Sequence, residues 1–91
     1  MANVTFTVNE LGTTDPDLAR NLEAEIAAVA LGADERTSLD CRILVDRGLD
    51  GRPSSVRVQF ERPGWVKSFG VSLAQPLREV RQAAEGALGA A

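Results

Sequence analysis

Apolar and polar residues alternate with a period of two along much of residues 37–73. In residues 38–46 the apolar row is Leu39, Cys41, Ile43 and Val45. Residues 54–61 and 65–73 continue the alternation, although Lys67 falls in the apolar row of the last segment. A period of two is typical of β-strands with one buried face. The pattern therefore predicts an antiparallel meander of three strands, 38–46, 54–61 and 65–73, with the third strand near an edge of the sheet.

The two connections within this meander differ in kind. Residues 47–53 contain two glycines and a proline, which predicts a loop of moderate length. The sequence Arg62-Pro63-Gly64-Trp65 predicts a type II turn, because proline presets φ at the first central position and glycine accepts a positive φ at the second.

The segment before the meander indicates a strand and then a helix. Residues 3–9 alternate and predict a short strand with one buried face, and residues 10–14 are expected to be a connector. Asp15-Pro16 is a helix-start signal, because aspartate caps free backbone amides and proline fits the first helical position. An amphipathic helix is predicted over residues 16–31.

A second amphipathic helix is predicted after the meander, over residues 76–88. Residues 72–75 have the spacing of a capping box, although which residue caps the helix is ambiguous. We expect residues 89–91 to fray, and we expect the buried stripe to consist of Leu77, Val80, Ala84, Ala87 and Leu88.

The fold class that follows is α+β, with the order β-α-β-β-β-α in one domain spanning residues 1–91. The expected arrangement is a four-stranded mixed sheet with two helices packed on one face, and strands one and two are parallel if they are neighbours. The uncovered sheet face is expected to present Thr5, Thr7, Arg42, Leu44, Arg57, Gln59 and Ser68.

The sequence shows neither a membrane-spanning run nor a signal peptide. No apolar segment approaches the roughly 18 residues that a transmembrane helix needs, and the first residues lack a basic segment followed by an apolar one. We therefore expect a cytoplasmic protein without a membrane partner. Its single cysteine, Cys41, is expected to be a buried core thiol.

Charge is distributed unevenly along the chain. Residues 1–40 contain two basic and eight acidic residues, whereas residues 41–91 contain eight basic and five acidic residues. Such polarity can orient the meander and the last helix towards an anionic partner. The simpler interpretation, which we favour, is a solvated surface that keeps the protein in solution.

The residue types needed for several kinds of chemistry are missing. The chain has no histidine, no tyrosine and one cysteine, which excludes Ser-His-Asp and Cys-His catalysis, histidine-based metal sites and zinc–thiolate clusters. No glycine-rich phosphate loop occurs. The carboxylates fall on predicted exposed positions, so we expect a non-catalytic protein without a metal, cofactor or small-molecule substrate.

The succession of Val56–Phe60, the Pro63-Gly64 turn, Phe69–Ser72 and the helix from Pro76 resembles the ribosome hibernation-promoting factor family, also called sigma-54 modulation proteins. The likeness extends over residues 4–88. The C-terminal part, from Cys41, also looks like the end of a double-stranded RNA-binding domain. It departs from that family because residues 73–77 lack the lysine cluster that contacts phosphates.

The first resemblance implies docking on the small ribosomal subunit, in the channel for messenger and transfer RNA, through basic side chains. The positions left to contact ribosomal or other structured RNA are Arg42, Arg57, Lys67, Arg78 and Arg81. Each also has a plain interpretation as a surface cation paired with a nearby acid. Five phosphate contacts would give a slope of log affinity against log salt of roughly −3.5 to −4.5.

Three further positions leave the choice of partner open. Trp65 follows a turn, where it either stacks on a base or covers the end of the core. Leu44 and Val66 are apolar residues on the otherwise polar sheet face, which favours a protein contact or a homodimer formed through the sheet or its edge. The alternative to an RNA-binding regulator is therefore a protein-interaction or homodimerising module of the same fold.

Overall fold

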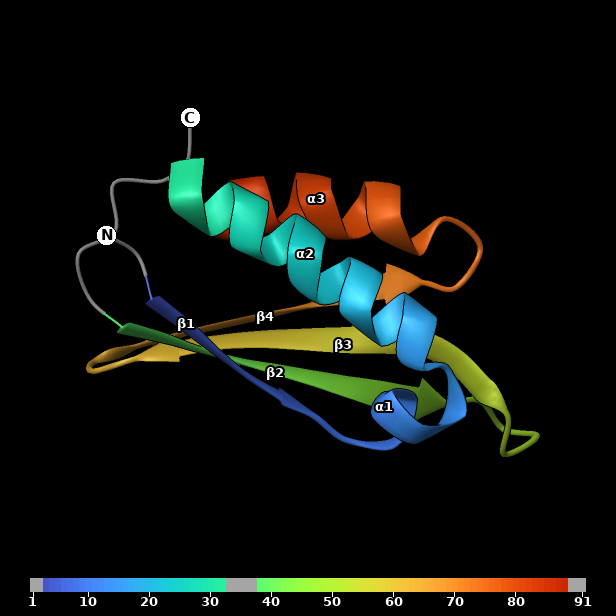
Figure 1. Cartoon of the computed structure of the whole chain (residues 1–91). Coiled ribbons are helices and arrows are strands. Elements are labelled where there is room, and N and C mark those ends of the chain that lie inside the picture. Colours follow the sequence, from blue (N-terminus) through green and yellow to red (C-terminus); the bar gives the residue numbers. More distant parts are fainter. Residues whose placement is uncertain (1–2, 33–37, 89–91) are drawn as a thin grey trace.

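The computed structural model describes residues 3–32 and 38–88 of the chain. Two layers make up the fold, a four-stranded sheet and the helices packed on it (Figure 1). In chain order, the elements are β1 (Asn3–Val8), α1 (Glu10–Thr14), α2 (Pro16–Gly32), β2 (Ser38–Arg47), β3 (Pro53–Arg62), β4 (Trp65–Ser72) and α3 (Pro76–Ala87).

The strands lie in sequence order, β1-β2-β3-β4, so that β1 and β4 are the two edges. β1 pairs with β2 in parallel, and β2, β3 and β4 pair antiparallel. Figure 1 shows α2 and α3 lying together on the same side of the sheet. The predicted α+β class, with a mixed sheet covered by two helices on one face, is confirmed.

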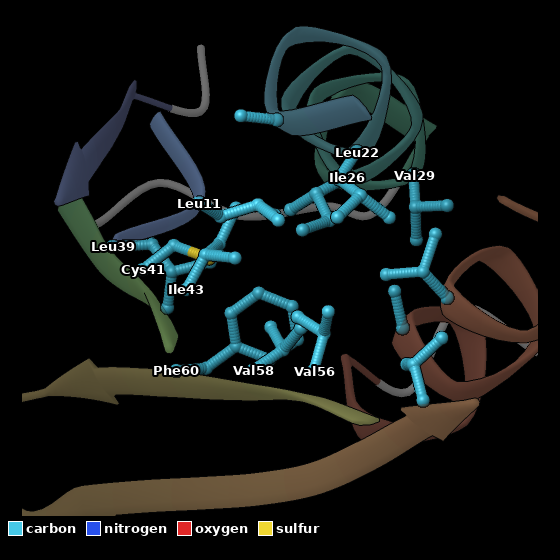
Figure 2. Packing of buried hydrophobic residues seen from close by; sticks show 14 residues of the cluster. Leu11, Leu22, Ile26, Val29, Leu39, Cys41, Ile43, Val56, Val58 and Phe60 are labelled. Carbon is cyan, nitrogen blue, oxygen red and sulfur yellow. The ribbon is translucent and has the colours of Figure 1, made fainter. Parts of the chain in front are cut away.

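The hydrophobic core fills the space between α2, α3 and the sheet. The alternating rows of β2 and β3 enter it together, because Cys41 is opposite Phe60 and Ile43 is opposite Val58. Figure 2 shows these side chains meeting Leu22 from α2. Alternation along the strands therefore divides the sheet into a helix-covered face and an uncovered one.

The helix starts partly follow the predicted signals. The backbone N–H of Leu18 donates to Asp15 Oδ1 at 3.2 Å, and Pro16 is the first residue of α2, so the Asp15 cap is confirmed. At α3 the N-cap residue is Gln75, which makes no side-chain capping bond. The Ser72 hydroxyl instead accepts a bond from the N–H of Ala74 at 3.0 Å, which orders the turn before the helix.

Two expectations were wrong in detail. The predicted connector at residues 10–14 is the short helix α1, which carries Leu11 into the core at 4% exposure. Leu77 was expected in the buried stripe of the last helix but is 36% exposed, because Val80 and Ala84 fill the contact with the core. The expected fraying of residues 89–91 lies outside the described residues.

Candidate interaction surface

The sheet face opposite α2 and α3 is not covered by any helix of the described residues (Figure 1). We call it the open face. Its side chains follow from the strand register, and each is exposed or half-buried: Thr5, Thr7, Asp40, Arg42, Leu44, Asp46, Ser55, Arg57, Gln59, Glu61, Val66, Ser68, Gly70 and Ser72.

A polar row crosses all four strands near the middle of the open face. Thr7 is opposite Arg42, Arg42 is opposite Gln59, and Gln59 is opposite Ser68. Arg42 is exposed and forms no ion pair with any residue that the structure describes. Its guanidinium is therefore surrounded in its row by hydroxyl and amide groups, which leave its donors available to an anionic ligand.

Carboxylates share the open face with its two arginines. Arg57 donates from Nε to Asp46 Oδ2 at 3.2 Å, and its Nη2 lies 3.1 Å from the same oxygen. Asp40 and Glu61 are opposite each other at the other end of the face. With two arginines and three carboxylates, the open face has a formal charge of −1.

The structure does not bring the five predicted basic residues together. Lys67 is opposite Phe60, so it belongs to the row that faces the helices rather than to the open face. Arg81 lies on α3, where Nη1 is 3.8 Å from Glu25 Oε2 and Nε is 3.5 Å from Glu85 Oε1. Thus only two of the five, Arg42 and Arg57, share the open face.

Arg78 on α3 lies on the helix layer. It is exposed and has no ion pair within residues 3–32 and 38–88. Arg42 and Arg78 therefore form a matched pair: both are exposed and lack an ion pair among the described residues, and they lie on different layers of the fold.

The tip of the β3–β4 hairpin carries an aromatic cluster. Trp65 is half-buried against the core, with the Arg62 guanidinium 4.3 Å from its ring centroid and the Lys67 ammonium 5.9 Å away. A shallow hollow of about 380 Å³ beside it is lined by Glu61, Arg62, Gly64, Trp65 and Val66. The interpretation of Trp65 as a cover for the core agrees with this packing.

Sequence reasoning missed the Arg62–Trp65 contact, although a signal for it was present. The two residues close a two-residue turn, and residues that close such a turn are direct cross-strand neighbours. A cation placed over an indole ring is attracted by the negative ring face. One face of the indole is thus already occupied by a side chain of the same hairpin.

A second, more enclosed cavity of about 260 Å³ lies where α1 meets the end of β2. It is lined by Leu11, Thr14, Asp15, Leu18, Val45, Pro53 and Leu73. Its polar groups already have partners: the Thr14 hydroxyl donates to the Glu10 carbonyl, and Asp15 caps α2. Sequence reasoning did not find this cavity, because the helix that forms its wall was predicted to be a connector.

Within the described residues there is no cluster of three or more histidine, cysteine, aspartate or glutamate side chains that could hold a metal ion. Burial raises the pKa of the Cys41 thiol to about 12, which is opposite to the shift that activates a nucleophilic cysteine.

Two comparisons with known proteins return no relative. No protein-family model matches the chain, and no curated protein matches it.

None of the helices in the described part of the chain has the length and apolar character needed to cross a membrane.

Proposed function

We propose that the protein is a non-catalytic regulator that binds ribosomal or other structured RNA through the open face, with Arg42 as the central contact. The observation that carries the proposal is the placement of Arg42. It lies in a polar row on the sheet face that the helices leave uncovered, and no carboxylate of the described residues pairs with it.

The geometry supports a smaller electrostatic contact than the sequence alone suggested. The open face presents Arg42 and Arg57 to a ligand, whereas Arg78 and Arg81 belong to the helix layer. Each phosphate contact contributes roughly −0.7 to −0.9 to the slope of log affinity against log salt. Two contacts therefore give a slope of roughly −1.4 to −1.8, well short of the value for five.

The test compares two arginine variants that differ only in location. Binding of the purified protein to small ribosomal subunits is measured by co-sedimentation, over a series of salt concentrations, for wild type, Arg42→Gln and Arg78→Gln. We expect Arg42→Gln to weaken binding and to reduce the slope by roughly 0.7 to 0.9. Arg78→Gln serves as the matched control and should leave both quantities unchanged.

Two results would contradict the proposal. The first is an absence of binding to small subunits at low salt, where phosphate contacts are strongest. The second is equal weakening by the two variants, because that would place the contact outside the open face or make it a general charge effect.

A second candidate function is docking of a protein partner on the same face. The observation that favours it is the mixture of groups there: three carboxylates reduce the attraction for a polyanion, and Val66 is 59% exposed. Leu44 adds a half-buried apolar group. This candidate predicts retention of a partner protein at high salt and loss of that partner in a Leu44→Asp variant, without binding to small subunits.

A further inference from the structure

Strand β4 presents a regular set of backbone groups at the edge of the sheet. The turn between β3 and β4 has two residues, so the closing residues Arg62 and Trp65 exchange backbone hydrogen bonds. Bonded pairs alternate along an antiparallel ladder, which makes Trp65, Lys67, Phe69 and Val71 the residues that bond to β3. The N–H and C=O groups of the even-numbered residues 66–72 therefore point away from the sheet.

Among the described residues, one of these outward groups has a side-chain partner. The N–H of Ser72 donates to Glu79 Oε1 at 3.2 Å, which closes the free edge at its C-terminal end. In the part of the chain that the structure describes, no strand pairs with β4 on this side. The strand contains no proline, and its register with β3 has no irregularity. Among the described residues, Val66, Ser68 and Gly70 thus form a hydrogen-bonding edge without proline, bulge or strand partner.

We propose that this edge pairs with β4 of a second copy of the chain, antiparallel and about a two-fold axis at Ser68. Ser68 is then opposite Ser68 of the second copy, and Val66 is opposite Gly70 of the second copy. The three outward residues of each chain would exchange six backbone hydrogen bonds, and the sheet would become continuous over eight strands.

The side chains favour this register over its neighbours. Val66 is 59% exposed, and a Cβ atom at Gly70 would have no heavy atom within 4 Å, so the valine of one copy fits over the bare glycine backbone of the other. An axis at Lys67 would place two ammonium groups opposite each other. An axis at Phe69 would pair Val66 with Ser72, whose N–H is already bonded to Glu79.

In the same register no charged residue of the open face lies directly opposite another across the seam, because the paired residues are Val66, Ser68 and Gly70. The cross-strand row of one copy contains Asp40, Glu61 and Val66, and it continues into Gly70 and Arg57 of the second copy. The two-fold axis generates the same row on the other side of Ser68. Each of these two rows therefore contains acidic residues of one copy and an arginine of the other. A second copy therefore fits the edge in backbone and shape, and it brings no like charges together at the seam.

The first test removes the backbone N–H of Ser68, which is the hydrogen-bond donor at the two-fold axis. Sedimentation equilibrium over about 1 μM to 1 mM protein measures self-association of wild type, Ser68→Pro and Ser68→Ala. Proline removes an outward N–H without breaking a bond to β3, so far-ultraviolet circular dichroism should be unchanged. We expect Ser68→Pro to raise the dimer dissociation constant about thirtyfold, because symmetry removes two hydrogen bonds, and Ser68→Ala to match wild type.

The second test reads the register directly. Cys41 is buried with a raised pKa, so Ser68→Cys supplies one accessible thiol for a short bismaleimide. The paired Cα atoms at position 68 would be about 5.5 Å apart, and rapid cross-linking is expected. Thr5→Cys is the matched control: its exposed position on β1 would be about 34 Å from its copy, seven strand spacings away.

Several outcomes would overturn the proposal. Wild type that remains monomeric throughout the concentration range would exclude the dimer. Equal cross-linking of Ser68→Cys and Thr5→Cys would place the contact elsewhere, as would a Ser68→Pro variant that folds and dimerises like wild type. These measurements contain no RNA, so their result is independent of the result of the ribosome-binding experiment.

Discussion

Because the thiol of Cys41 is buried, we expect the fold to become less stable as the pH rises into the alkaline range. Cys41 lies on the core-facing row of β2, opposite Phe6 on one side and Phe60 on the other, with no exposed surface (Figure 2). Burial, followed by the negative charge of Glu23, raises its pKa from 9.0 to about 12. A thiolate is poorly solvated in such a site, so the native state holds its proton.

The direction and size of the effect follow from proton linkage. Between pH 9 and pH 12 the unfolded chain loses the thiol proton and the native chain keeps it, so the free energy of unfolding falls as pH rises. The slope is about 1.4 kcal/mol per pH unit. At pH 10.5 the loss is therefore about 2 kcal/mol relative to pH 8, where Cys41 is protonated in both states.

Urea unfolding of wild type and Cys41→Val at pH 8 and pH 10.5 isolates this term. Valine fills the site without a titrating group. The pH dependence of the variant's free energy of unfolding therefore comes from the other titrating residues alone. We expect the wild type to lose about 2 kcal/mol more than the variant between the two pH values. Equal losses in the two proteins would refute the reasoning, because they would mean that the thiol ionises in the folded state without penalty.

Three further predictions concern packing, turn conformation and surface charge, each measured by urea unfolding. Leu22→Ala in the core should lower the free energy of unfolding by about 3 kcal/mol, whereas Leu49→Ala, at a fully exposed loop position, should change it by less than about 0.5 kcal/mol. Gly64→Ala should destabilise by about 1 to 2 kcal/mol, because φ is +74° there, whereas Gly70→Ala, without positive φ or close contacts, should be neutral or stabilising. Asp46→Asn should cost less than about 1 kcal/mol, because its ion pair is half-exposed; a larger loss would show that the pair orders the loop.

The sequence predicted the sheet well because the two central strands, β2 and β3, each bury one face. The alternation in β2 and β3 determined which residues enter the core, and the structure places Cys41 and Val58 there as expected. Lys67 in the apolar row of β4 indicated an edge strand, and β4 is an edge. The Pro63-Gly64 signal likewise agrees with a positive φ at Gly64.

The sequence pattern could not predict features that depend on contacts between helices and strands. α1 has five residues, too few to show helical periodicity, and its formation depends on the burial of Leu11. The pairing of Arg57 with Asp46 depends on the register between β2 and β3, which a loop of uncertain length did not determine. Similarly, the position of Arg81 beside Glu25 requires knowing how α2 and α3 pack.

The two proposals reinforce each other through the central row of the open face. An axis at Ser68 would make the row from Thr7 through Arg42 and Gln59 to Ser68 continuous with the same row of a second copy. The two Arg42 residues would be about 24 Å apart, five strand spacings, on one surface. A dimer doubles the carboxylates of this face together with its arginines, so its advantage for a polyanion is that two Arg42 side chains, which lack an ion pair among the described residues, contact the same ligand. Any RNA long enough to contact both copies would therefore bind the dimer more tightly than the monomer, and by linkage it would stabilise the β4 pairing to the same extent.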